Sequence, residues 1–211
     1  MENIKNIIFD YGNVIFTIDF KRAQEAFSNL GIKDVTAFFA HKAHNSLFDD
    51  FETAAISPAE FRAGIRQAAE NNDLTDEEID AAWNSLLIGT PPQNHDVLRQ
   101  VKQKYRTFLL SNNNEIHYNW ITAYLQTTFE LENLDNYFEK AYFSQHMKLR
   151  KPHTAIFEQV ICENSLNPAE TLFIDDSPQH IEGARKAGLH TLLMTEPAER
   201  LGEFLKQHGI I

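Results

Sequence analysis

The chain has 211 residues, 43% of them hydrophobic and 23% charged, which suits one folded core with a modest appendage. Its 30 acidic side chains outnumber 19 scattered basic ones, and the net charge of −11 argues against nucleic acid as a partner. A single cysteine excludes an internal disulfide, and the absence of a signal-like or membrane-length segment predicts a cytoplasmic protein that binds no membrane.

The first predicted element is a short buried strand, residues 4–9, which ends directly before Asp10. Residues 16–94 then follow as a block that reads almost entirely as helix. Two capping boxes, at Ser57 and Thr75, mark helix starts within the block, and Gly31 suits a helix stop after residues 20–30. An all-helical insert after the first strand predicts a helical cap over the carboxyl end of that strand.

Beyond residue 105, apolar strand-like runs alternate with helical patterns such as 153–164 and 178–187. This alternation is typical of right-handed βαβ units on a parallel sheet. We therefore predict an α/β fold with a Rossmann-like parallel sheet of about five strands, its core formed by 1–15 and 95–211 and its cap by 16–94. The four later strands are expected at 107–110, 141–143, 171–174 and 191–194.

Polar side chains follow three of these strands. Asp10 ends the first, Ser111 the second, and the pair Asp175 and Asp176 the fourth. Ligands of open α/β sheets bind outside the carboxyl ends of the strands, where these groups converge if the strands are neighbours. Carboxylates so close together repel one another unless a cation lies among them, and oxygen ligands favour Mg²⁺.

A fourth group precedes the helix that starts near residue 153. Pro152 forces Lys151 into an extended conformation, so that the lysine projects near the helix N-terminus, where it would pair with a carboxylate or a phosphoryl oxygen. Ser111 is likewise followed by three asparagines, 112–114, and a helical pattern, which predicts an anion site at a helix start.

These residues, in this order and spacing, resemble the four motifs of the haloacid dehalogenase-like hydrolases. The resemblance covers nearly the whole chain, including the inserted cap. The first motif is most similar to that of bacterial sugar-phosphate phosphatases, among them those that act on glucose 1-phosphate. The matching segments are Phe9-Asp10-Tyr11-Gly12-Asn13-Val14, Ser111-Asn112, Lys151-Pro152 and Phe173-Ile174-Asp175-Asp176-Ser177.

The resemblance implies a Mg²⁺-dependent phosphatase of a small phosphorylated metabolite, with Asp10 as the nucleophile that forms an aspartyl phosphate. It implies three groups that hold the transferring phosphoryl group: Ser111, the backbone of Asn112, and Lys151. The metal ligands that it implies are Asp10, the carbonyl of Gly12, and Asp176, with Asp175 in support directly or through water.

The chain departs from the family at Gly12, where most members carry a second aspartate that acts as general acid and base. Glycine cannot transfer a proton. Asp19, His41 and His44 are the nearest possible substitutes in sequence, although each residue type is also common as a helix cap or at the surface.

Two other activities stay open. A metal-independent 2-haloacid dehalogenase also lacks the second aspartate, but it does not need the adjacent pair Asp175 and Asp176. A retired phosphatase that only binds ligands would fit Gly12, but not the retained nucleophile, serine and lysine. The particular substrate, the cap residues that face the site and the oligomeric state do not follow from the sequence.

Overall fold

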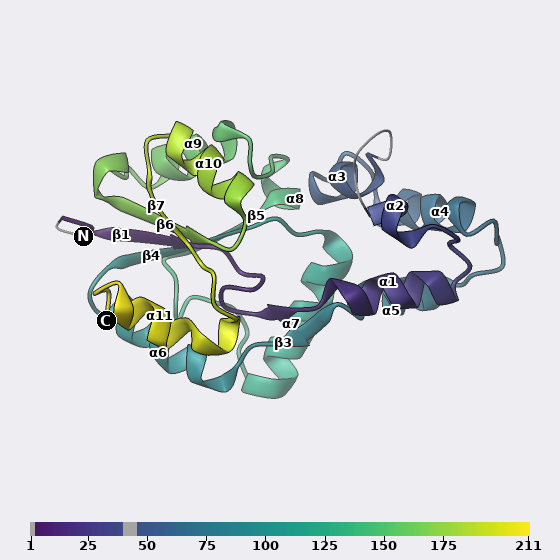
Figure 1. Cartoon of the computed structure of the whole chain (residues 1–211), viewed down its shortest axis with the longest axis horizontal. Helices are drawn as coiled ribbons and strands as arrows, with labels where there is room; N and C mark the ends of the chain where they lie inside the picture. The colour runs from purple at the N-terminus through teal and green to yellow at the C-terminus, as the bar shows by residue number, and fades with distance from the viewer. Residues whose placement is uncertain (1–2, 40–45) are drawn as a thin grey trace.

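The computed structural model describes residues 3–39 and 46–211 and contains a five-stranded parallel sheet in the order β5-β4-β1-β6-β7. The α/β fold with a parallel sheet is therefore confirmed, and all five predicted strands form within two residues of their expected limits. The first strand of the chain lies in the centre of the sheet (Figure 1). The strands are β1 Asn6–Phe9, β4 Arg106–Ser111, β5 Lys140–Phe143, β6 Thr171–Asp175 and β7 His190–Leu193.

Helices cover both faces of this sheet, because alternate side chains of each strand point to opposite faces (Figure 1). Ile7 and Phe9 of β1 belong to one hydrophobic cluster with residues of α6, α7 and α11, whereas Ile8 belongs to another with residues of α9 and α10. The helices of this part are α6 Pro92–Lys102, α7 Glu115–Phe129, α8 Ser144–Met147, α9 Thr154–Glu163, α10 Pro178–Lys186 and α11 Leu201–Gln207, with 3₁₀ turns at Pro168–Glu170 and Ala198–Arg200.

The inserted block forms a helical cap at one end of the molecule (Figure 1). Both predicted capping boxes are present, at Ser57 and Thr75, and Gly31 follows the first helix with a φ of +109°. Aromatic side chains of the cap pack around Phe27, Phe61 and Trp83, within the same continuous hydrophobic cluster as Ile7 and Phe9. Its helices are α1 Phe20–Asn29, α2 Val35–Phe39, α3 Leu47–Glu52, α4 Pro58–Ala68 and α5 Asp76–Asn84.

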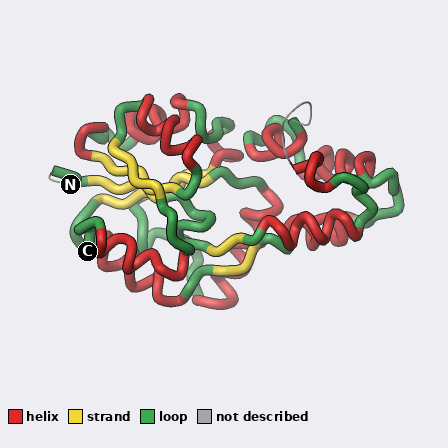
Figure 2. Tube along the Cα trace, viewed as in Figure 1, coloured by secondary structure: helices red, strands yellow, loops and turns green. Residues whose placement is uncertain are grey.

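Two short strands connect the cap to the core, a feature that the helical reading of 16–94 missed. Strands β2 Thr17–Ile18 and β3 Leu87–Gly89 pair antiparallel and run side by side between the two parts (Figure 2). Strands of two or three residues are too short to show a periodic pattern. The predicted limit between residues 94 and 95 falls inside α6, and the domain limits stay a prediction. Within the described residues, no helix is both long and apolar enough to cross a bilayer.

Candidate active site

Three neighbouring strands bring their terminal polar residues to the same edge of the sheet. β1 lies between β4 and β6, and the backbone N–H of Asp10 extends the β1–β6 pairing by donating to the carbonyl of Ile174 at 2.9 Å. Asp175 ends β6 in register with Asp10, and Ser111 ends β4 on the other side. The convergence expected from the strand order is therefore present in the structure.

Lys151 lies inside this cluster and is completely buried. Its Nζ donates to Asp10 Oδ1 and to Asp175 Oδ2, both at 2.7 Å. The backbone of Lys151 is fixed by the Asn112 side chain, which accepts from its N–H at 2.9 Å and donates to its carbonyl at 3.0 Å. A buried ammonium with two carboxylate partners holds one geometry, since either broken contact would leave a buried charge unpaired.

Both carboxylate oxygens of Asp175 already accept hydrogen bonds from the protein. Besides Lys151, it accepts from the backbone N–H of Ser177 at 2.8 Å and lies 3.0 Å from Nδ1 of His180. Asp176 accepts from the Asn13 side chain at 3.2 Å. His180 was not predicted from the sequence, although its place in the first turn of α10 directs it back toward the end of β6.

The carboxylates of Asp10, Asp175 and Asp176 offer oxygens that all lie within 4.8 Å of one another. Burial and the charge of Asp175 raise the pKa of Asp10, and the same two causes raise the pKa of Asp176. Burial alone would also raise the pKa of Asp175, but Lys151 and His180 outweigh it and lower that pKa. Three carboxylates against one lysine leave an excess of negative charge that a cation would offset.

The donor set fits Mg²⁺ in two further respects. All the candidate ligand atoms are oxygens, and the Gly12 carbonyl receives no hydrogen bond from the described residues. Because Asp175 is already occupied by Lys151 and Ser177, Asp10 and Asp176 are the carboxylates with oxygens to spare. This arrangement agrees with the ligand roles expected from the sequence, which stay predictions.

Above the cluster lies a cavity of about 320 Å³ between core and cap. Asp10, Asp176, Ser111 and Lys151 line its floor, and aromatic residues of the cap line the opposite side. The Ser111 hydroxyl is buried, and its only hydrogen bond within the described residues is a long one of 3.3 Å to the Asn112 carbonyl. It is therefore available to a ligand.

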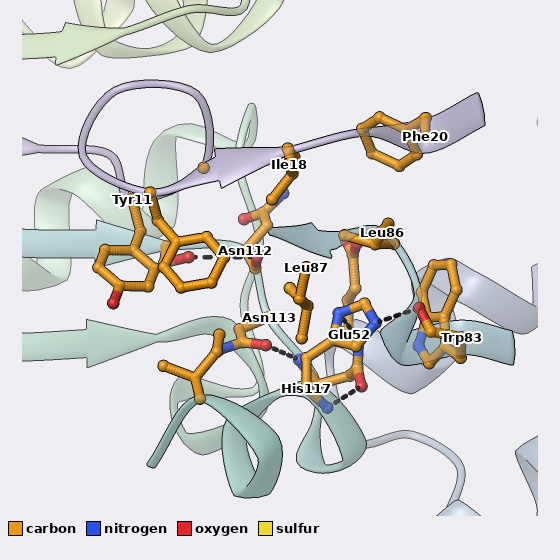
Figure 3. A pocket seen from close by; sticks show the side chains of 15 residues that line it. Tyr11, Ile18, Phe20, Glu52, Trp83, Leu86, Leu87, Asn112, Asn113 and His117 are labelled. Atoms are coloured by element: carbon orange, nitrogen blue, oxygen red, sulfur yellow. Dashed lines mark hydrogen bonds between the residues drawn. The ribbon is translucent and has the colours of Figure 1, made fainter. Parts of the chain in front are cut away.

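A smaller cavity of about 90 Å³ shares a wall with the first, which includes Gly12, Asn112 and Trp83. Figure 3 shows Tyr11 and Trp83 on opposite sides of this cavity. His117 of α7 stacks on the Trp83 ring at 4.4 Å, and its Nε2 lies 3.2 Å from the Trp83 carbonyl (Figure 3). This contact joins the core to the cap beside the strand ends.

Of the three other candidates for proton transfer, only Asp19 lies within the described residues, and it does not reach the site. Asp19 is the N-cap of α1, where its side chain accepts from the N–H of Lys21 at 3.0 Å, and it lines neither cavity. His41 and His44 lie outside the described residues. At Gly12, an added Cβ would lie 3.1 Å from the tip of the Ile18 side chain.

Known proteins share this architecture and much of this sequence. Residues 92–194 match the haloacid dehalogenase-like hydrolase family. A D-ribitol-5-phosphate phosphatase from Bacteroides thetaiotaomicron is 31% identical over 188 residues, which are 89% of this chain and 90% of that enzyme. A HAD family enzyme from the same organism has a solved structure with 34% identity and a TM-score of 0.85, which covers 97% of this chain and 99% of that one. Its complex with magnesium and inorganic phosphate matches with 36% identity and a TM-score of 0.80, over 90% and 93% of the two chains.

Proposed function

Since the chain belongs to the haloacid dehalogenase-like hydrolases, we propose that it is a Mg²⁺-dependent phosphatase of a small phosphorylated metabolite, a sugar or polyol phosphate. The observation that carries the proposal is the buried contact of Lys151 with Asp10 and Asp175 beside Asp176. Support comes from the similar ribitol phosphate phosphatase and from the magnesium and phosphate in the similar structure.

In the proposed reaction, a carboxylate oxygen of Asp10 attacks phosphorus, and the bond between phosphorus and the ester oxygen breaks. The leaving oxygen takes a proton from water, because Gly12 offers no acid, and departs as the alcohol, while an aspartyl phosphate stays on Asp10. Water then attacks the same phosphorus, which releases inorganic phosphate and restores the carboxylate. The two steps replace one direct attack by water, which is slow on a phosphate dianion.

Lys151 and Ser111 would hold the oxygens of the transferring group, together with the backbone N–H of Asn112. The Lys151 ammonium is placed in advance by its two carboxylate partners and by the Asn112 clamp, so it needs no reorganisation as charge develops. Mg²⁺, when bound by Asp10, Asp176 and the Gly12 carbonyl, would neutralise charge on the phosphoryl oxygens.

The dehalogenase alternative gains no support from the site. Asp176 lies on the cavity beside Asp10 and is held by Asn13, an arrangement that serves a cation. A halide-releasing reaction at carbon has no need for a cation there. The phosphate in the similar structure also favours phosphoryl chemistry.

The test is turnover of a panel of phosphorylated sugars and polyols with Mg²⁺, compared between the wild type and Asp10→Asn. We expect the variant to lose hydrolysis while it keeps its fold, because an amide of nearly the same shape is a poor nucleophile. Acid-quenched wild-type enzyme should carry a hydroxylamine-labile phosphate that the variant lacks. Wild-type turnover by Asp10→Asn would overturn the proposal.

A further inference from the structure

The cap side of the larger cavity, opposite Asp10, is lined by aromatic side chains and carries two polar groups. Phe20, Phe39, Phe48 and Trp83 line the larger cavity on this side, and among them lies the carboxylate of Glu52. Glu52 and Trp83 line both cavities, so they stand where the part of a substrate beyond its phosphate would lie.

The Glu52 carboxylate is held by one of its two oxygens. Arg150, the residue before Lys151, reaches Glu52 Oε2 with Nε at 2.9 Å and with Nη2 at 2.8 Å. Glu52 Oε1 receives no hydrogen bond from any residue that the structure describes. An oriented acceptor therefore remains unused at the cavity wall.

Trp83 offers the complementary group. Its Nε1–H is buried and has no hydrogen-bond partner within the described chain, although the side chain is only 5% exposed. The ring cannot easily turn to find a partner, because it packs against Phe48 and stacks on His117. A buried donor without a partner costs about 1–3 kcal/mol, so such groups usually serve a ligand or a water.

We propose that Glu52 Oε1 and Trp83 Nε1–H form a subsite for hydroxyl groups of the leaving alcohol, which selects polyhydroxylated phosphate monoesters over apolar ones. The proposal rests on the proposed phosphatase function. A hydroxyl group can donate to the carboxylate and accept from the indole. An alkyl chain in the same place would leave both groups buried and unpaired, which is the strongest basis for discrimination between substrates.

Arg150 also pairs with a second carboxylate of the cap, because its Nη1 lies 3.0 Å from Asp49 Oδ1.

The experiment compares kcat/KM for pentitol 5-phosphates with that for n-pentyl phosphate. Both are primary alkyl esters of equal carbon chain length, and they differ in the hydroxyl groups. In the wild type we expect kcat/KM for the pentitol ester to exceed that for n-pentyl phosphate at least about tenfold, because the pentyl chain cannot form the hydrogen bonds. Glu52→Gln, which turns the free acceptor into a donor, and Trp83→Phe, which replaces the indole by a smaller aromatic ring without an N–H, should each reduce this ratio about tenfold or more.

Asp49→Asn is the matched control, because it weakens the same Arg150 pairing without changing a cavity-lining residue. We expect it to leave the ratio unchanged. Any of three results would overturn the subsite. The first is a ratio near one in the wild type, and the second is an unchanged ratio in Trp83→Phe. The third is a fall of the ratio in Asp49→Asn as large as that in Glu52→Gln. If Glu52→Gln does not fold, Trp83→Phe decides alone. Failure of the phosphatase function itself is distinct, since neither ester would then be hydrolysed.

Discussion

The core wall and the cap wall of the cavity differ in how their polar groups are paired. In the core wall the buried lysine is fully paired: Lys151 bridges Asp10 and Asp175, and Asn112 clamps the lysine backbone. In the cap wall, Trp83 keeps a buried donor without a partner. A site that performs the same chemistry on every substrate profits from charged groups that are held in advance, whereas a site that recognises one substrate must leave groups for that substrate to pair with.

Metal removal is expected to have the largest effect, and it acts through the core wall. Excess chelator should lower kcat/KM by at least about 10³-fold on every phosphate monoester, because charge neutralisation by Mg²⁺ contributes several kcal/mol. In a Mg²⁺ titration of activity, Asp176→Ala should raise the half-saturating concentration more than Asp175→Ala, since Asp175 is occupied by protein donors. Full activity in chelator would contradict the metal role and revive the dehalogenase reading.

Gly183→Ala tests how tightly the core wall is built. An added Cβ on α10 would lie 2.2 Å from the Pro152 carbonyl oxygen, so the loop that carries Lys151 must shift. We expect a loss of about 1–3 kcal/mol in the free energy of unfolding, with reduced kcat. Urea unfolding and steady-state kinetics measure both.

Gly202→Ala in α11 is the matched control for that variant. Its Cβ would meet only the Val97 side chain, at 3.0 Å, which can move aside. The change in its unfolding free energy should stay within about 1 kcal/mol of zero. Equal effects of the two substitutions would show that the Pro152 contact is not a constraint.

His117 links the core wall to the cap wall, and the pH dependence of stability tests whether it is held neutral there. Its Nε2–H donates to the Trp83 carbonyl, and its Nδ1 accepts from Asn114 Nδ2, because Asn114 Oδ1 already accepts from the His117 N–H. Burial lowers the pKa of His117 to about 3. Below the ordinary histidine pKa of about 6.5 only the unfolded state takes up the proton, so stability is lost as pH falls from about 6.5 toward 3.

Between pH 7 and pH 5 this histidine should reduce the free energy of unfolding by about 2 kcal/mol. The measurement is urea unfolding of the wild type and of His117→Gln at both pH values. The wild type should lose about 2 kcal/mol more than the variant over this interval. The same pH dependence in both proteins would mean that His117 is not held neutral.

The smallest expected effect is at Gly12. Without an acid there, cleavage in the wild type should depend on the acidity of the leaving alcohol, so log kcat/KM for an aryl phosphate series should fall as leaving-group pKa rises. Gly12→Asp should flatten this slope and speed the poorest leaving groups about tenfold, provided that Ile18 moves aside from the new Cβ. A flat plot in the wild type would mean that another residue already supplies the proton.

The sequence by itself determined most of the elements and which polar residues end the strands. Buried strands, capping boxes and the residues that end parallel strands are local features, and Asp10, Ser111 and Asp175 meet because the structure makes β4, β1 and β6 neighbours. Lys151 was predicted to pair with a carboxylate or a phosphoryl oxygen, and it pairs with two carboxylates.

Only the tertiary structure decided which cap side chains line the cavity. Glu52 faces the site because α3 docks on Arg150, 98 residues away in the chain, and Trp83 faces it because His117 and the cap aromatics hold its ring. Asp19, which is as close to Asp10 in sequence as any candidate, is instead a helix cap. Local patterns fix which residues form a helix and which face is apolar, but the docking of one helix on another depends on packing that no short segment encodes.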